Sequence, residues 1–340
     1  MKGGKDGKDG KDGKGGKVHN PVHIGSSDIT LFDRHRMTLL SVFPIFPVLP
    51  VFPVHEGQPL APHDLWTAWS WEPVVLISLL ASAWLYVRGV RALWKSAGRG
   101  HGVRRWEAAA FACGWLTLMV ALVSPLHRLG GVLFSAHMAQ HELLMVVSAP
   151  LLVLGRPIIP FLWAIPLSWR RVLGTWSATR PVDAIWTWLT RPSVAWALHA
   201  VAIWLWHAPS LYQATLASEA VHTLQHVSFL VTALLFWWAL LHGREGRLGR
   251  PAAVIYLFTT AGHTSLLGAL LTFSSRLWYP LYHSTTAPWG LTPLEDQQLA
   301  GVIMWVPAGL SYLIAALALA STWLREPAAR PAFQPSTLPQ

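Results

Sequence analysis

The sequence is poor in charge and in cysteine. Asp, Glu, Lys and Arg make up only 12% of its 340 residues, about half the share found in an average soluble domain. Together with 53% hydrophobic residues and 21 tryptophans, this shortage excludes a disordered protein and disfavours a water-soluble enzyme. The single cysteine, Cys113, excludes a disulfide framework and a cysteine-based zinc site.

Long apolar runs take the place of the missing charge. Seven stretches come close to the length of about 20 residues that crosses a hydrocarbon core. They cover residues 74–91, 106–124, 132–154, 193–209, 220–241, 251–273 and 299–323. We therefore expect an all-α polytopic membrane bundle of about seven transmembrane helices, formed by residues 71–325. A shorter apolar piece, residues 157–167, contains three prolines and is expected to be re-entrant or interfacial.

Both ends of the chain differ from this apolar middle. Residues 1–36 are rich in Gly, Lys and Asp, and we predict that they form a disordered tail, as do residues 326–340. Residues 37–70 form a proline-rich apolar segment and a linker. A proline at every third position from Pro44 to Pro53 opposes a transmembrane helix there. The sequence leaves open whether this segment acts as a signal or lies at the membrane interface.

Basic residues alternate between the loops. The loops after the first, third and fifth stretches and the C-terminal tail together carry sixteen Lys and Arg residues, whereas the alternate loops carry only Arg128 and Arg276. The positive-inside rule then predicts an N-terminus outside and a C-terminus in the cytoplasm. Because the net charge of +10 is spread over a tail and short loops, the lipid bilayer is the expected partner and nucleic acid is not.

Histidines recur at one predicted depth. The third and fifth stretches each contain His-x-x-Gln-His, a spacing that places both imidazoles on one face of a helix. Ionisable groups within a membrane are costly, so their presence there indicates a function. Two further histidines lie at the predicted outer ends of neighbouring stretches. The expected metal ligands are His127, His137, His141, His207, His222 and His226.

Polar neighbours of these histidines are expected to assist binding of a cofactor or metal. Glu142 follows His141 but points about 100° away from it around the helix, so it could orient a ligand or relay protons. Asp296 opens the seventh stretch, either as a helix cap or as a polar lip over the histidines. The full set is Gln140, Glu142, Gln225, Asp296 and Gln297.

Copper fits these residues better than the alternatives do. Imidazole binds copper, zinc, iron and nickel, and the thioethers of Met138, Met145 and Met304 would favour Cu(I), although methionine also fills space in membrane helices. Haem held between two helices is the serious rival. Two histidines four residues apart on one helix, however, cannot both reach one haem iron along the same axial direction.

Three blocks of sequence carry a resemblance to a known family. They are SAHMAQHELLMVVSAPLLVLGRP (135–157), WHAPSLYQATLASEAVHTLQHVSFLVTALLFWW (206–238) and WGLTPLEDQQLAGVIMWVPAGLSYL (289–313). Together they resemble the bacterial CtaG-type cytochrome c oxidase assembly proteins. The resemblance covers most of residues 70–325, and the first 60 residues have no counterpart in it. Gln225 stands where many members have an acidic residue.

The resemblance implies a function for the whole chain. Such proteins lie in the bacterial plasma membrane and help to mature haem-copper oxidases, so the expected role is copper binding and delivery, not enzymatic catalysis. Cytochrome c oxidase subunits, and an extracellular or periplasmic copper chaperone, are the implied partners. A membrane oxidoreductase with b-type haem is the first alternative. A copper transporter is the second, although the inner halves of the third and fifth stretches are almost wholly apolar.

Overall fold

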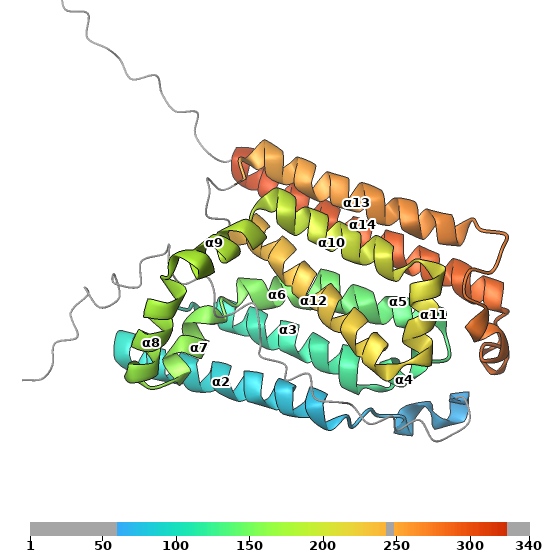
Figure 1. Ribbon diagram of the computed structural model, residues 1–340, viewed down its shortest axis with the longest axis horizontal. Helices are drawn as coiled ribbons and strands as arrows, with labels where there is room; N and C mark the ends of the chain where they lie inside the picture. The colour runs from blue at the N-terminus through green and yellow to red at the C-terminus, as the bar shows by residue number, and fades with distance from the viewer. Residues whose placement is uncertain (1–59, 243–247, 325–340) are drawn as a thin grey trace, which may run out of the picture.

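Long helices dominate the computed structural model, which describes residues 60–242 and 248–324 (Figure 1). Six helices in this part of the chain are long and apolar enough to cross a membrane, or seven if one bent pair counts as a single span. The expected all-α polytopic bundle is thus confirmed, while the orientation of its termini stays a prediction. The predicted tails, residues 1–36 and 326–340, and the proline-rich residues 37–54 lie outside the described residues.

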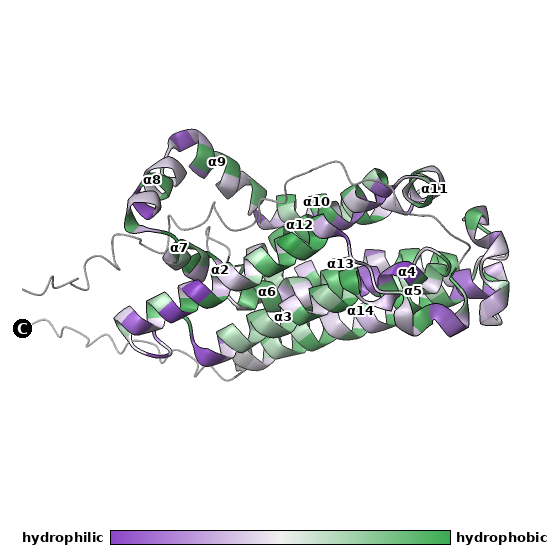
Figure 2. Ribbon diagram, turned by 90° about the horizontal axis from the view of Figure 1, so that it is seen from below, coloured by the Kyte–Doolittle hydropathy of each residue, from purple (hydrophilic) through white to green (hydrophobic). Residues whose placement is uncertain are grey.

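The elements follow one another with short connections. In chain order they are η1 (Pro62–Thr67), α2 (Pro73–Ala97), α3 (Arg105–Val123), α4 (Pro125–Leu129), α5 (Phe134–Glu142), η2 (Leu143–Ser148), α6 (Ala149–Leu154), α7 (Ile158–Ala164), α8 (Leu167–Ser177), α9 (Arg180–Leu189), α10 (Pro192–Trp206), α11 (Pro209–Ala217), α12 (Glu219–His242), α13 (Arg250–Thr272), η3 (Pro280–Ser284), η4 (Ala287–Trp289) and α14 (Pro293–Leu324). Hydrophobic residues extend along the long helices, and hydrophilic ones gather towards their ends (Figure 2). This distribution suits a bundle surrounded by lipid.

The third predicted span is one continuous rod with an irregular centre. Between α5 and α6 the backbone takes a π-helical turn over Leu143–Ser148. Pro150 lies two residues after this turn, and a proline ring clashes with the carbonyl four residues earlier in a regular α-helix. The wider turn accommodates this proline without ending the span.

The fourth predicted span is broken rather than straight. Its helix α10 ends at Trp206, and α11 begins at Pro209 at an angle of 74°. Proline fixes its own backbone and disfavours a helical conformation in the residue before it, so Ala208 is extended and the direction changes there. The expectation of a single helix over residues 193–209 therefore needs this correction at its C-terminal end, where His207 lies.

The two ends of the bundle are built differently. Helices α4 and α11 lie with α5 at one end, whereas α8 and α9 lie at the other (Figures 1 and 2). The short α7, within the piece predicted to be re-entrant or interfacial, packs against α2 so closely that a Cβ at Gly89 would collide with the Pro160 carbonyl. Loops with opposite predicted sidedness thus lie at opposite ends of the structure.

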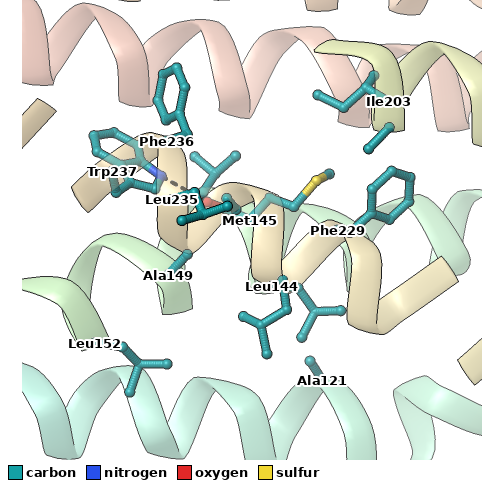
Figure 3. Close-up of a cluster of buried hydrophobic side chains, with 14 of the residues drawn as sticks. Ala121, Leu144, Met145, Ala149, Leu152, Ile203, Phe229, Leu235, Phe236 and Trp237 are labelled. Carbon is teal, nitrogen blue, oxygen red and sulfur yellow. Dashed lines mark hydrogen bonds between the residues drawn. The ribbon is translucent and has the colours of Figure 1, made fainter. Parts of the chain in front are cut away.

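Between these ends most of the buried side chains are apolar. Helix α12 contributes Phe229, Leu235, Phe236 and Trp237 to a cluster that also includes residues of η2 and α6 (Figure 3). The Trp237 indole donates a hydrogen bond of 3.0 Å to the Met145 carbonyl. This carbonyl lies in the π-turn, so the indole helps to satisfy irregular backbone within an apolar core.

Candidate metal centre

The start of α5 is held by a carboxylate from the opposite end of the sequence. The buried Asp296, in the first turn of α14, accepts hydrogen bonds from the backbone N–H of Phe134 at 2.7 Å and of Ser135 at 3.1 Å, and from the Ser135 hydroxyl. These are the donors that a helix leaves unpaired at its N-terminus. Asp296 thereby fixes the helix whose next turns carry His137 and His141.

Six histidines gather above the apolar core. The His137 ring centroid lies 4.4 Å from that of His141, 5.0 Å from His222 and 5.7 Å from His226. His127 stacks on His222 at 5.5 Å, and His207 lies 6.4 Å from His141. The structure therefore brings together all six histidines predicted as metal ligands. We call His137, His141, His222 and His226 the histidine cluster.

Three members of the cluster have the geometry of a metal site. One nitrogen from each of His137, His222 and His226 can be chosen so that all three lie within 4.8 Å of one another. Two come from α12 at positions i and i+4, and the third comes from α5. A rigid helix face thus supplies two donors and a facing helix supplies the third, an arrangement found in bundle metal sites.

A second group of donors adjoins this one and includes a residue that the sequence reasoning missed. His127, Glu219 and His222 also offer atoms within 4.8 Å of one another. Glu219 precedes His222 by three residues at the start of α12, with its Oε1 4.0 Å from the His222 Nδ1. The Glu-x-x-His spacing was the available signal, since residues three apart share a helix face.

Hydrogen bonds fix two of the imidazoles. The Gln140 amide donates to His127 Nδ1 at 2.9 Å and to the Ala121 carbonyl at 2.7 Å, while His127 Nε2 lies 3.2 Å from Glu72 Oε1. His137 Nε2 lies 3.2 Å from Gln225 Oε1. The two predicted glutamines therefore orient histidines, as outer-shell groups do in metal sites.

Several buried polar atoms at the cluster have no hydrogen-bond partner within the described part of the chain. They are both ring nitrogens of His141, Nε2 of His226 and Nε2 of Gln225. Such atoms are uncommon in folded proteins and call for an explanation. Lone pairs on imidazole nitrogens are ligands for copper and zinc, so the residues present fit a metal ion.

Asp296 and Gln297 hydrogen-bond to backbone groups of other segments. Gln297 Oε1 accepts from the Trp278 backbone N–H at 2.6 Å, and its Nε2 donates to the Arg276 carbonyl at 3.0 Å. Neither residue bonds to a histidine among the residues described. The sequence predicts that Asp296 either caps its own helix or forms a polar lip over the histidines. Its carboxylate instead caps the N-terminus of α5.

Tyrosines unmarked by any sequence motif close the end of the cluster. The Tyr212 and Tyr282 hydroxyls lie 2.9 Å apart, and Tyr282 donates to the Gly130 carbonyl at 2.9 Å. Tyr279 donates to the His207 carbonyl at 2.8 Å. Burial raises the pKa of Tyr279 and of Tyr282 well above the ordinary value, so both phenols stay neutral and serve as donors.

Comparison with known proteins places the chain in a family. The sequence model of the cytochrome c oxidase caa3 assembly factor family matches residues 84–326, which include every histidine of the cluster. The chain belongs to that family. The match confirms the resemblance inferred from the three sequence blocks. No solved structure matches the chain.

The curated relatives of this family member are longer proteins. It is 29% identical over 273 residues to uncharacterized protein Mb0105 of Mycobacterium bovis and to uncharacterized protein MT0111 of Mycobacterium tuberculosis. It is 30% identical over 229 residues to uncharacterized protein ML1998 of Mycobacterium leprae. The alignments cover 76%, 76% and 62% of this chain but only 40%, 40% and 34% of those proteins.

Proposed function

We propose that this assembly factor binds copper as cargo at the histidine cluster and delivers it to cytochrome c oxidase in the bacterial plasma membrane. In this role the protein is a transfer factor, not an enzyme. Oxidase subunits are its recipients, and a copper chaperone outside the membrane is its donor.

The observation that carries this proposal is the convergence of three imidazole donors from two helices. His137, His222 and His226 offer nitrogens within 4.8 Å of one another, and His137 is fully buried. Three neutral imidazole nitrogens would hold copper with a low coordination number, and Gln225, which orients His137, adds no charge to the site. A carrier needs such a site, since a closed cage of four strong ligands would release its metal slowly.

The same contacts disfavour a b-type haem. A porphyrin held between α5 and α12 would need a slot between two imidazoles that approach the iron from opposite faces. The His222 and His226 centroids lie 4.2 Å apart, and both rings lie within 5.7 Å of His137. The rings thus contact one another directly, which suits one small ion.

The core beneath the cluster disfavours transport through the bundle. A permeating copper ion would need polar ligands along the whole depth of the membrane. Leu144, Ala149, Leu152 and Phe236 instead belong to one cluster of buried apolar side chains (Figure 3). Copper that reaches the histidines would therefore leave by the end at which it entered.

Maturation of the oxidase in cells tests the proposal. In a strain lacking this factor, the full chain should restore copper to the oxidase, whereas the His137→Ala/His222→Ala variant should not. Added copper should partly rescue the variant, because the defect lies in supply. His263→Ala is the matched control, since His263 lies on α13 against Trp196 and away from the cluster.

Two results would oppose the proposal. If the double variant accumulates in the membrane and restores oxidase copper as well as the wild type does, the histidine cluster does not deliver copper. If His263→Ala fails to the same degree, the loss reflects general damage to membrane helices and not the loss of ligands.

A further inference from the structure

A small cavity adjoins the histidine cluster on the side facing α13 and α14. The cavity volume open to the centre of a water molecule is about 10 Å³. This is about the volume that one water molecule needs. Three of the six methionines in the chain line it, together with three potential ligands that carry nitrogen or oxygen. These residues are Met138, His141, Glu142, Met145, His207 and Met304.

One imidazole in this cavity is already oriented as a ligand. His207 Nδ1 lies 2.7 Å from the Ile203 carbonyl, which can only accept, so Nδ1 carries the proton and Nε2 carries the lone pair. Metal-binding histidines commonly donate their other N–H to a backbone carbonyl in this way. The bend at Pro209 places His207 there, and the Tyr279 hydroxyl holds its carbonyl at 2.8 Å.

The lone pair of His207 faces a sulfur atom. His207 Nε2 lies 3.3 Å from Met138 Sδ, and a thioether is at best a weak acceptor with no proton to donate. Two hydrogen-bond acceptors at this distance do not stabilise each other, because neither has a proton to donate. With metal bonds of about 2.0 Å to nitrogen and about 2.3 Å to sulfur, a 3.3 Å separation gives an angle of about 100° at one shared ion.

Two further side chains support a cation at this place. His141 is 1% exposed, and both of its ring nitrogens lack a hydrogen-bond partner among the described residues. Glu142 Oε2 is buried and likewise unpartnered in the described structure. A buried carboxylate is costly unless a cation or a proton compensates its charge, and a monovalent ion would do so.

From these contacts we infer a second metal site in which Met138, His207 and His141 bind one Cu(I) ion, with Glu142 balancing its charge. The inference rests on the proposed function and deepens it. Thioether sulfur selects Cu(I) over zinc and Cu(II), whereas the histidine cluster offers nitrogen only. His141 lies between the two sites, 5.2 Å from His226 and 6.4 Å from His207 by ring centroid, so its imidazole is the next ligand that copper leaving the first site would meet.

Copper binding to the purified full chain tests this site. The Cys113→Ser protein in detergent would be titrated anaerobically with Cu(I) against a coloured Cu(I) chelator, then measured by X-ray absorption. We expect two equivalents of copper, with both nitrogen and sulfur neighbours. Met138→Leu should lose one equivalent and the sulfur signal, whereas His222→Ala should lose one equivalent and keep it. Met119→Leu, a methionine outside the cavity, is the matched control and should bind as the parent does.

The other outcomes of this experiment would overturn either the second site or the proposed function. One equivalent with nitrogen neighbours alone would overturn the second site and leave the histidine cluster intact. An unchanged sulfur signal in Met138→Leu would also overturn it. Absence of copper from the parent protein would overturn the proposed function itself. Because methionine is the only sulfur left in the parent, its spectrum is decisive even if Met138→Leu fails to fold.

Discussion

Replacing Asp296 with alanine should loosen the helix that carries half of the histidine cluster. The carboxylate connects the first turn of α14 to the first turn of α5 through three hydrogen bonds. Asp296→Ala removes the only acceptor that these bonds share. The N-terminus of α5 then has two backbone donors in a buried position without the acceptor that now satisfies them.

The size of the effect follows from those donors. A buried donor left unsatisfied costs about 1 to 3 kcal/mol, and the Ser135 hydroxyl can turn to another acceptor. Two backbone N–H groups therefore give a loss of about 2 to 4 kcal/mol, after allowing for water that reaches this end of the bundle. At about 2 °C or more per kcal/mol, the Tm should fall by at least about 4 °C.

Thermal unfolding in detergent, followed by the fluorescence of the 21 tryptophans, measures this loss. Glu295→Ala is the matched control, because the neighbouring carboxylate accepts from the Thr292 N–H and hydroxyl at an exposed position. It should shift the Tm much less. A Tm for Asp296→Ala within about 1 °C of the wild type would refute the reasoning, because the buried donors would then carry little energy. An equal loss of Tm in Glu295→Ala would refute it as well, because the loss would then not depend on burial.

Three other perturbations follow from the structure. Gly301→Ala places a Cβ 2.6 Å from the backbone of α13, so it should destabilise the α13–α14 pair by about 1 to 3 kcal/mol in the same unfolding assay; Gly262→Ala, with nothing within 4 Å, should not. Gln225→Ala removes the partner of a cluster histidine and should lower copper affinity by about 10- to 100-fold in a chelator competition, and an unchanged affinity would contradict its orienting role. In a cysteine-free background, a thiol at Gln213 should react with an impermeant reagent in intact cells and a thiol at Arg171 should not; the reverse pattern would place the histidines on the cytoplasmic side.

The gathering of the six histidines could be predicted because helix geometry makes it a local problem. A spacing of four residues fixes which helix face carries both imidazoles. The position of the histidines along each apolar stretch fixes their depth in the membrane. The His-x-x-Gln-His repeats on two spans therefore anticipated that His137 and His222 would meet. The apolar sequence that follows the histidines in both spans likewise anticipated the apolar cluster of η2, α6 and α12.

Other features depend on contacts between distant parts of the chain. Asp296 caps a helix that begins more than 160 residues earlier, and no local pattern shows which helix end lies beside it. Met138 shares a helix with the cluster but faces His207, whose position depends on the bend that Pro209 introduces. The Glu219-x-x-His222 spacing is visible in the sequence. It brings the two side chains together only if the helix includes Glu219, as α12 does.

The copper retained by the purified full chain tests most directly whether the histidine cluster binds copper. After equilibration with Cu(I) and removal of excess metal, the wild type should retain one equivalent more than His222→Ala/His226→Ala, and His199→Ala/His263→Ala should match the wild type. Equal copper in the wild type and in the cluster variant would contradict the account, because His222 and His226 supply two of the three converging nitrogens.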